Sequence, residues 1–522
     1  MRHGRIIAAA AAALSTAALW PAGAAADDVL VVSTTTDDPG LTCVSAVACS
    51  LRGAITAANA DADHDIVAIL PGTYSLSLGT QLAVTAPVTI VSTGTPRNTA
   101  VAGAGSRVLK TSADTVLAGF TLRDGNGKDG GLPLPGALSP RGGGVWQAAG
   151  NLTLANMRVT ANQVDNATAS GGGIQHEGAG TLTIAATLVD TNLAKGGTAA
   201  GQLGRGGGIF AATGSGAVTI ASSTLTANGV QGAAGSQGGG LATETGSSVA
   251  LVNATLAANT ATGAGTLGGN VAPGGPVTAR NTIVSGGTAP AGANCAGALS
   301  SQGSNLELGT GCGFDRNADP GLGALADNGG PTDTLAITTA SPAFDAGTDA
   351  GCPAIDQRGQ GRPQGRVCDI GAFEVVAPRP AAPGNGGGNG SGGAGTPSAD
   401  LRPPVLTRLA VAPFAFRSAP SGPSARAAAA RRPAPVGALV SHTLSEAATV
   451  AYVVERSLPR NRWAAMTGAF ARRAVRGVNR FRFTGRLSGK RLAPGRYRLL
   501  TIARDTAGNV STVSRREFRI VR

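Results

Sequence analysis

The sequence predicts an all-β protein in which a right-handed parallel β-helix, a solenoid of stacked coils, precedes a small β-sandwich. A glycine triplet followed by an apolar residue recurs at Gly142–Val145, Gly171–Ile174, Gly206–Ile209 and Gly238–Leu241, with a degenerate copy at Gly268–Val271. Between triplets, an apolar residue is followed eight positions later by an asparagine, as in Leu154 and Asn162. These offsets are fixed, whereas successive triplets lie 29 to 35 residues apart, which indicates one structural unit with variable loops. After residue 400, short strand-like runs alternate with turn residues, which predicts the sandwich.

The repeated asparagines predict a ladder of side-chain amides along the solenoid, formed by Asn162, Asn192, Asn228 and Asn259. Each amide can bond its counterpart one coil away and satisfy backbone groups at the bend. Runs such as Leu152-Thr153-Leu154 alternate apolar and polar residues, so we expect the apolar ones to stack inward. The glycine triplets suit a sharp corner or a close approach between coils. An ordinary β-sandwich is the alternative, but it does not explain identical offsets in four units.

The first 26 residues have the features of a secretory signal peptide. Arg2 and Arg5 precede an apolar stretch from Ile6 to Trp20, and Ala24-Ala25-Ala26 resembles a cleavage site. A membrane anchor is the alternative, but the apolar stretch is short and Pro21 follows it. No later stretch reaches the roughly 18 to 20 apolar residues of a membrane span. We therefore expect a secreted protein, either extracellular or on the cell surface, with no membrane span.

Six cysteines in an exported chain favour disulfide bonds. Six cysteines allow fifteen connectivities. Pairing of nearest neighbours would close three local loops that flank the repeats: Cys43 with Cys49, Cys295 with Cys312, and Cys352 with Cys368. The sequence has no Cys-x-x-Cys or Cys/His cluster typical of zinc sites, so disulfides are favoured over metal binding.

Residues 27–65 are expected to cap the open N-terminal end of the solenoid. Leu51, Ile55 and Ala58 fall on one face of a short amphipathic helix that could cover it. The run Cys49-Ser50-Leu51-Arg52-Gly53-Ala54 resembles the exported-protein motif named for its Cys-Ser-Leu-Arg-Glu-Ala sequence, with Gly53 where that family has glutamate. The missing glutamate removes a candidate partner for a local salt bridge.

Residues 66–376 are expected to form the β-helix. Its last part, about 295–376, contains a series of short motifs: Asp319–Leu322, Asp327–Thr332, Ser341–Gly347, Asp356–Gly359 and Cys368–Glu374. This series resembles the C-terminal signature of secreted β-helix proteins of the choice-of-anchor Q type. With the N-terminal motif, the resemblance extends over roughly residues 29–376. It implies that the region from about 295 completes the β-helix.

Residues 377–400 are rich in Gly, Pro, Asn and Ser, which predicts a flexible linker. In the module that follows, 401–522, the stretch 418–436 is expected to be disordered. Leu444–Ala448 and Leu492–Arg498 resemble an Ig-like β-sandwich module found at the ends of bacterial surface proteins.

The chain from residue 400 onward has 24 Arg and Lys residues but only 5 Asp and Glu residues, against 42 and 29 in the whole chain. We expect weak attachment to an anionic envelope polymer, against the alternative of a merely solvated basic face; export argues against nucleic acid.

The sequence does not predict a catalytic site. Enzymes with this fold place carboxylates, or carboxylates with Ca²⁺, on one outward face. Two acidic stretches could hold Ca²⁺ but are more often polar loops: Asp61, Asp63 and Asp65; and Asp124, Asn126 and Asp129. Asp165 and Asp190 are expected to be isolated, and His176-Glu177 to lie in a solvated loop. We predict no catalytic or cofactor-binding residue and no cofactor.

The sequence therefore predicts an exported, non-enzymatic scaffold that is adhesin-like or structural. The expected partners are cell-wall or extracellular polysaccharide, or the surface of a host or neighbouring cell. The alternative is a polysaccharide-active β-helix enzyme, either a lyase or a glycoside hydrolase.

Overall fold

The structure is a computed structural model of the 522-residue chain, and it describes residues 29–41, 43, 49–128, 140–376, 404–427, 436–459, 462–487, 490–505, 509 and 511–522. The expected signal peptide (1–26), the expected linker (377–400) and Asp129 lie outside the described residues.

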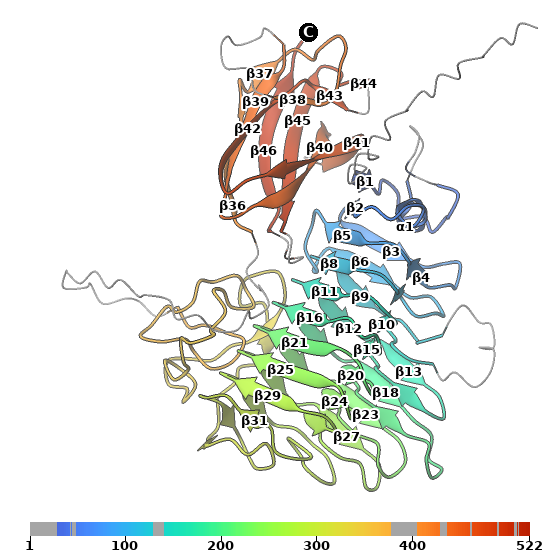
Figure 1. Cartoon of the computed structure of the whole chain (residues 1–522), viewed down its shortest axis with the longest axis vertical. Helices are drawn as coiled ribbons and strands as arrows, with labels where there is room; N and C mark the ends of the chain where they lie inside the picture. Colours follow the sequence, from blue (N-terminus) through green and yellow to red (C-terminus); the bar gives the residue numbers. More distant parts are fainter. Residues whose placement is uncertain are drawn as a thin grey trace, which may run out of the picture.

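Three long parallel sheets run along the β-helix (Figure 1). Sheet A contains β1 (Val29–Val31), β2 (Asp65–Ile69), β5 (Val88–Ser92), β8 (Thr115–Ala118), β11 (Leu152–Ala155), β16 (Leu182–Ala185), β21 (Ala217–Ala221), β25 (Ser248–Val252), β29 (Val277–Arg280) and β31 (Ser300–Ser301). Sheet B contains β3 (Gly72–Ser75), β6 (Thr99–Ala102), β9 (Thr121–Arg123), β12 (Arg158–Thr160), β17 (Leu188–Asp190), β22 (Thr224–Thr226), β26 (Thr255–Ala257), β30 (Ile283–Ser285), β32 (Leu306–Glu307) and β33 (Arg316–Asn317). Sheet C contains β4 (Leu82–Val84), β7 (Leu109–Thr111), β10 (Val145–Gln147), β15 (Ile174–His176), β20 (Ile209–Ala211), β24 (Leu241–Thr243) and β28 (Val271–Pro273).

Shorter ladders join the loops between these sheets. One contains β13 (Gln163–Asp165), β18 (Leu193–Lys195), β23 (Gly229–Gln231) and β27 (Thr260–Thr262), and another pairs β14 (Ala169–Ser170) with β19 (Gly204–Arg205). The predicted parallel β-helix is confirmed.

Equivalent residues of successive coils stack directly on one another in the core. In sheet A, Leu154 pairs in register with Ile184, Ile184 with Ile220, and Ile220 with Leu251. All four side chains are buried, whereas the intervening residue, such as Thr219, points outward. Each coil therefore buries its apolar residues only because the next coil covers them, which ties the stability of every coil to its neighbours.

The asparagine ladder is present and buried. The side-chain amide of Asn162 donates to Oδ1 of Asn192, that of Asn192 to Asn228, and that of Asn228 to Asn259, each at 2.9 Å. The third glycine of each triplet faces this ladder; a Cβ on Gly208 would lie 2.6 Å from the carbonyl oxygen of Gly240 and 3.0 Å from Cγ of Asn228. Glycine is thus required at this place, because any side chain would clash with the backbone of the next coil and with the asparagine amide.

The N-terminal cap is the helix α1 (Leu51–Ala58), which packs against β2 and β4. Ser50 caps it by accepting a hydrogen bond from the backbone N–H of Gly53. Arg52 Nε donates to Asp37 Oδ1 at 2.6 Å, so a salt bridge forms with an aspartate rather than with the glutamate that is absent here. A Cβ on Gly53 would lie 2.3 Å from the carbonyl oxygen of Leu41, so this backbone leaves no room for a glutamate.

After β33 the chain leaves the coil path, and residues 319–376, here called the strap, run back along the side of the β-helix (Figure 1). Its strands β34 (Leu325–Ala326) and β35 (Thr334–Leu335) pair antiparallel. Polar contacts fasten it to coils far apart in sequence: Arg97 to Asp327 at 2.8 Å, Ser222 to the carbonyl of Ile355 at 2.8 Å, and Ala372 N–H to Thr255 at 2.9 Å. The resemblance implied that the region from about 295 completes the β-helix. This holds for its first part, where β31, β32 and β33 extend sheets A and B, whereas residues 319–376 form a lateral brace.

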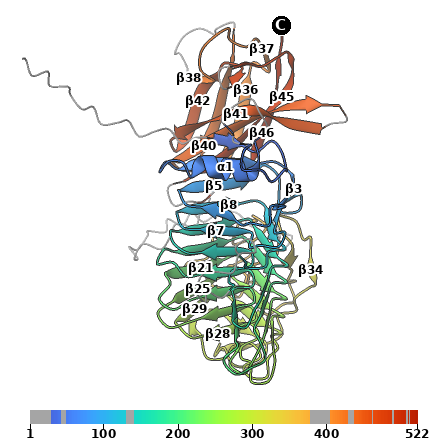
Figure 2. The ribbon, with the colours of Figure 1, turned by 90° about the vertical axis from the view of Figure 1, so that its right-hand side faces the viewer.

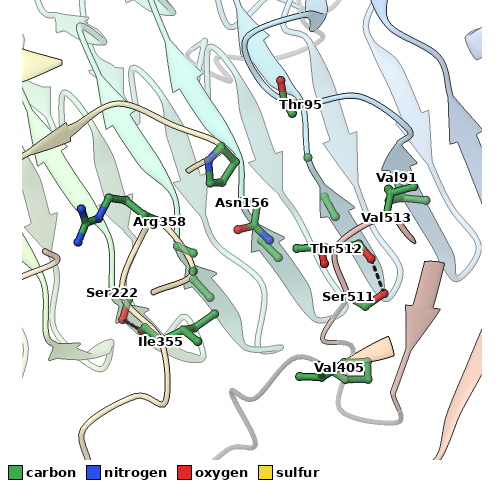
Figure 3. Close-up of a pocket in the computed structure, with 18 of the residues that line it drawn as sticks. Val91, Thr95, Asn156, Ser222, Ile355, Arg358, Val405, Ser511, Thr512 and Val513 are labelled. Carbon is green, nitrogen blue, oxygen red and sulfur yellow. Dashed lines mark hydrogen bonds between the residues drawn. The ribbon is translucent and has the colours of Figure 1, made fainter. Parts of the chain in front are cut away.

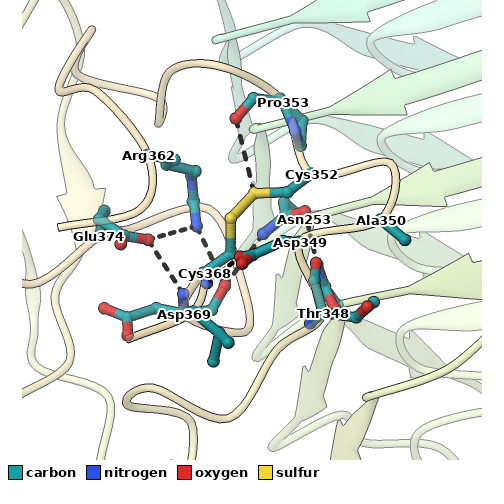
Figure 4. The surroundings of a disulfide bond; sticks show 12 residues. Asn253, Thr348, Asp349, Ala350, Cys352, Pro353, Arg362, Cys368, Asp369 and Glu374 are labelled. Carbon is teal, nitrogen blue, oxygen red and sulfur yellow. Dashed lines mark hydrogen bonds and ion pairs between the residues drawn. A yellow bond between two sulfur atoms is a disulfide. The ribbon is translucent and has the colours of Figure 1, made fainter. Parts of the chain in front are cut away.

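A disulfide and a buried ion pair hold the strap together (Figure 4). Cys352 bonds to Cys368, and Arg362 Nη1 lies 2.9 Å from Glu374 Oε2, with both side chains fully buried. Arg362 also donates to the carbonyl of Asp369 at 3.0 Å. The other disulfides join Cys43 to Cys49 and Cys295 to Cys312, which is the nearest-neighbour pairing.

The C-terminal module is a β-sandwich, as predicted. One sheet contains β36 (Leu406–Ala412), β39 (Ala438–Leu444), β42 (Gly477–Phe483) and β38 (Ala425–Ala427); the other contains β37 (Ala415–Phe416), β46 (Ser514–Ile520), β45 (Gly495–Arg504), β40 (Ala448–Leu458) and β41 (Arg462–Ala474), and β43 (Arg486–Leu487) pairs with β44 (Lys490–Arg491). Packed aromatic rings link the two sheets, among them Phe416, Phe483, Phe518, Tyr452 and Phe481. The expected disorder of 418–436 is wrong for residues 418–427, because β38 pairs with β42 there; residues 428–435 lie outside the described residues.

The module packs against the N-terminal end of sheet A (Figures 1 and 2). Val453 and Leu500 of its five-stranded sheet form one buried cluster with Val31 and Ala68 of the β-helix. Ile502 joins a second such cluster, which includes residues of β2, β5, β8 and β11. The first coils are therefore apolar on both faces because both faces are covered.

Candidate functional site

A cleft of about 820 Å³ lies between the β-helix, the strap and the module (Figure 3). Small residues at the ends of sheet A strands line its floor: Ala118, Ala155, Ala185 and Ala221. The strap contributes Ile355 and Arg358, and the module contributes Val405 and the segment 511–513. This volume is in the range of small-molecule sites, and the lining is mainly apolar. The cleft therefore suits an apolar guest better than proton-transfer chemistry.

A second candidate is the outward surface of sheet C around Trp146, which we call the Trp146 face. The register places Trp146, Gln175, Phe210 and Ala242 side by side on successive strands. Lys110 precedes them on β7, with Nζ 4.3 Å from the centroid of the Trp146 ring. Because the flanking residues of each strand point into the core, this row faces away from the core. Trp146 is partly exposed, whereas Gln175, Phe210 and Ala242 are covered.

Two ion pairs of the same kind cross from coil to coil on the Trp146 face. Arg141 pairs with Glu177, whose other carboxylate oxygen accepts a hydrogen bond from Trp146 Nε1 at 2.8 Å. Two coils farther on, Arg205 Nε lies 3.4 Å from Glu244 Oε1. In both cases the arginine pairs with the glutamate of the following coil, so the arrangement repeats with a period of two coils.

A hollow of about 390 Å³ lies between these two ion pairs. Its lining includes Gln175 and Phe210, which are only 1% and 4% exposed. Gln175 Nε2 donates to Glu177 Oε1 at 3.0 Å, but its buried Oε1 has no hydrogen-bond partner among the described residues. Thr213 Oγ1 donates to Glu244 Oε2 at 2.6 Å. The hollow thus brings charged donors, charged acceptors and aromatic surface into one small volume.

The sequence contained a signal for this surface that the asparagine offsets alone do not reveal. Trp146, Gln175, Phe210 and Ala242 each follow directly after the apolar residue that ends a triplet unit. Glu177 and Glu244 each lie three residues after that apolar residue. Comparing these two offsets across units would have placed the charged and aromatic residues in columns on one face.

The Ca²⁺ candidates do not converge. Asp61 Oδ1 accepts a hydrogen bond from the N–H of Asp63 at 3.0 Å, and Asp65 is buried in β2. Asp124 forms an ion pair with its neighbour Arg123. Asn126 Oδ1 accepts from the N–H of Lys128 at 3.1 Å, and Asp129 is outside the described residues. Across the described ranges, no group of three or more His, Cys, Asp or Glu side chains is placed to hold a metal ion.

His176 is not in a solvated loop. It ends β15 and is fully buried, with Nδ1 2.9 Å from Gln147 Oε1 and Nε2 2.9 Å from the carbonyl oxygen of Gly216. Burial lowers the pKa of this imidazole, which the nearby Gly216 carbonyl partly opposes. The histidine belongs to the interior of the coil corner, so it cannot act on a ligand at the surface.

The two aspartates expected to be isolated are both paired. Asp190 is buried and accepts two hydrogen bonds from Arg158, at 2.9 and 2.7 Å. Asp165 lies 2.9 Å from Lys195 Nζ on the surface. These side chains join neighbouring coils rather than forming a site of their own.

Comparisons with known proteins find no protein-family model that matches the chain and no curated protein that is significantly similar to it. The resemblance to choice-of-anchor Q proteins therefore stays a prediction. Within the described part of the chain, no helix is long and apolar enough to cross a membrane.

Proposed function

We propose that the protein is an exported, non-enzymatic scaffold of the cell surface or extracellular space, either adhesin-like or structural. The observation that carries this proposal is the bracing of the β-helix against local unfolding. A buried amide ladder joins its coils, a helix covers its first coil, and a disulfide-closed strap ties distant coils together. Such a rod presents its outward faces in a fixed arrangement, which suits repeated contacts with an extended partner.

The charge of the C-terminal module supports attachment to an anionic envelope polymer. Every charged residue that is exposed in the described part of the module is basic; among them are Arg408, Arg417, Arg473, Arg476, Arg480, Arg516 and Arg519. Its acidic residues are instead buried or partly covered, as with Glu455, which pairs with Arg498. Attraction between such a surface and a polyanion weakens as salt screens it.

Fractionation of the native protein between medium, wall and membrane tests the proposed location. Purified full-length protein should bind purified anionic wall polymer at low salt and release it at about 1 M salt, where the Debye length falls to about 3 Å. Replacing Arg473, Arg476 and Arg480 by Glu should abolish this binding, whereas Lys195→Glu on the β-helix should preserve it. Binding that resists salt, or that survives the triple replacement, would overturn attachment through the module.

The alternative proposal, a polysaccharide-active enzyme, is favoured by one observation, the two glutamates that flank the hollow on the Trp146 face. Incubation with polygalacturonate, alginate and related polymers tests it by the release of new unsaturated or reducing ends. Release that is lost in Glu177→Gln or Glu244→Gln would replace the scaffold proposal. We expect no release, because both carboxylates are already engaged by fixed donors.

A further inference from the structure

We propose that the hollow on the Trp146 face binds a neutral, hydroxyl-rich polysaccharide whose chain runs along the axis of the β-helix. This inference rests on the proposed function, because it assigns the site and the ligand class through which an exported scaffold would contact extracellular polymer. Three features carry it: an unsatisfied buried acceptor, the charge pattern around the hollow, and the two-coil period.

The unsatisfied acceptor is the side-chain oxygen of Gln175. This amide is almost completely buried in the lining of the hollow, and its nitrogen is already committed to Glu177. A buried acceptor without a donor is costly and uncommon in folded proteins. A ligand hydroxyl that enters the hollow, with a small rotation of the neighbouring side chains, would supply the missing donor. The side-chain oxygen of Gln175 is thus an acceptor that a hydrogen-bond donor of a bound ligand can satisfy.

The charge pattern selects hydroxyl groups over charged groups. Each ion pair offers guanidinium N–H donors next to carboxylate acceptors, Arg141 beside Glu177 and Arg205 beside Glu244. A hydroxyl both donates and accepts, so it can bond either member of a pair. A uronate carboxylate would lie close to one of the two glutamates, and an ammonium group would lie close to one of the two arginines. A neutral sugar is repelled neither by the glutamates nor by the arginines.

The spacing suits a polymer. Arg141, Ser170 and Arg205 occupy equivalent places on three successive coils, so the small Ser170 separates the two arginines and leaves room between them. Coils are about 4.8 Å apart, which puts the two ion pairs about 10 Å apart. One pyranose unit of an extended chain is about as long as one coil spacing, so every second sugar would meet an equivalent ion pair. Trp146 is tied to this track through its hydrogen bond to Glu177, and Lys110 and Arg141 lie over its ring, so a ligand that bonds the Arg141–Glu177 pair changes the surroundings of the indole.

Calorimetric titration of the full-length protein tests the proposal. The probes are neutral oligomers of β-1,4-linked glucose, mannose, xylose and N-acetylglucosamine, with oligogalacturonate as the charged comparison. We expect at least one neutral series to bind, more tightly as the chain lengthens from two to four units. Glu244→Ala and Gln175→Leu should each weaken binding about tenfold or more, whereas Asp165→Ala, which breaks the exposed pair with Lys195, should not change it. Ligand should also change the tryptophan fluorescence of the Trp463→Phe variant, which keeps Trp146 near the hollow. It should not change the fluorescence of the Trp146→Phe variant, which keeps the distant Trp463.

The proposal is overturned if no neutral series binds, if only oligogalacturonate binds, or if Glu244→Ala binds as tightly as the original protein while both melt at the same temperature. Glu244 lies at the surface, so this variant is informative even where Gln175→Leu disturbs folding. Retention of the protein on wall polymer without neutral-sugar binding would refute this site alone. Cleavage of a bound oligomer would instead refute the non-enzymatic scaffold while keeping the site.

Discussion

The side-chain amide of Asn259 donates to Oδ1 of Asn270 at 2.8 Å, although Asn270 occupies the place that the third glycine of the triplet has in earlier coils. In the same coil, Gly287 occupies the place of Asn259. The asparagine and the glycine have exchanged positions, so the amide enters the ladder from the opposite side. Asn294 then continues the ladder, accepting from Asn270 at 3.0 Å. The row of amides therefore stays continuous in space from Asn162 to Asn294, although the residue that supplies the amide changes its place in the coil, because the buried backbone groups at this corner need a partner.

Asn228→Ala should destabilise the protein by about 3 kcal/mol or more, because it leaves several buried groups without partners at about 1–3 kcal/mol each. Asn228 donates to the carbonyls of Val189 and Thr226 and accepts from both the backbone and side-chain N–H groups of Asn192. Urea unfolding followed by circular dichroism measures the loss. Gln231→Ala in the same coil, at an exposed position, should stay within about 0.5 kcal/mol. Equal effects of the two changes would refute the role of the ladder.

The coils were predictable from sequence because each one repeats a local pattern. Residues that alternate with period two, such as Leu152-Thr153-Leu154, define an inward and an outward face without knowledge of the rest of the chain. The Gly-to-Asn exchange in the coil formed by β28, β29 and β30 was not predicted, because the fixed offset that identifies the ladder fails at Asn270. The column of Trp146 and Gln175 was missed for a related reason: only a comparison between units shows that these outward residues are neighbours.

Docking of the module and of the strap depends on which outward faces become covered, and the repeat does not specify this. A signal was nevertheless present. The run Ile66-Val67-Ala68-Ile69 is apolar at every position, which is typical of a parallel strand buried on both faces, whereas Thr153 and Thr183 mark faces that are open. The change from strands that are apolar at every position to strands that alternate thus indicates where the C-terminal module stops covering the outer face of sheet A.

Ile220→Asp should unfold the solenoid, because it places an unpaired charge between stacked coils. Ile220 is fully buried between Ile184 and Leu251. The neighbouring change Thr219→Asp puts the same charge on the outward face and should leave the far-ultraviolet circular dichroism spectrum and the melting temperature nearly unchanged. Normal spectra and melting of Ile220→Asp would contradict the inward assignment.

Glu374→Gln should destabilise the strap by about 3–5 kcal/mol, because the buried Arg362 would lose the carboxylate with which it forms its ion pair. The matched control is Asp165→Asn, which removes one partner of the exposed pair with Lys195 and should cost less than about 1 kcal/mol. Limited proteolysis within 319–376 and urea unfolding both report the change. A strap as protease-resistant as the original would show that the buried ion pair does not stabilise it.

Acid should destabilise the protein through two buried histidines, His176 and His442, and the half-buried His64. Burial lowers the pKa of His64 and of His442 to about 4, and lowers that of His176. The folded state therefore prefers the neutral imidazoles, so this stability is complete above the unfolded pKa of about 6.5 and is lost as pH falls from there toward 4. For His442 the full shift corresponds to about 3 kcal/mol. Asp369 acts in the opposite direction, because burial raises its pKa to about 6 and stability is lost as pH rises through that value.

His442→Gln isolates the effect of one histidine. His442 Nε2 lies 2.7 Å from the hydroxyl of Tyr452, and glutamine can preserve a hydrogen bond there without titrating. Melting of the module between pH 7 and pH 4 should therefore fall less steeply in His442→Gln than in the original protein. Identical pH profiles would show that His442 protonation does not destabilise the fold.

Leu500→Asp should release the module from the β-helix while both remain folded. Leu500 lies in the interface cluster with Val31 and Val453, whereas its neighbour Leu499 belongs to the core of the module. A charge at this place removes apolar contact between the two parts and leaves each core intact. Small-angle X-ray scattering should show a larger radius of gyration for Leu500→Asp, and no change for Arg516→Asp on the exposed neighbouring strand. An unchanged radius for Leu500→Asp would mean that this interface does not hold the module in place.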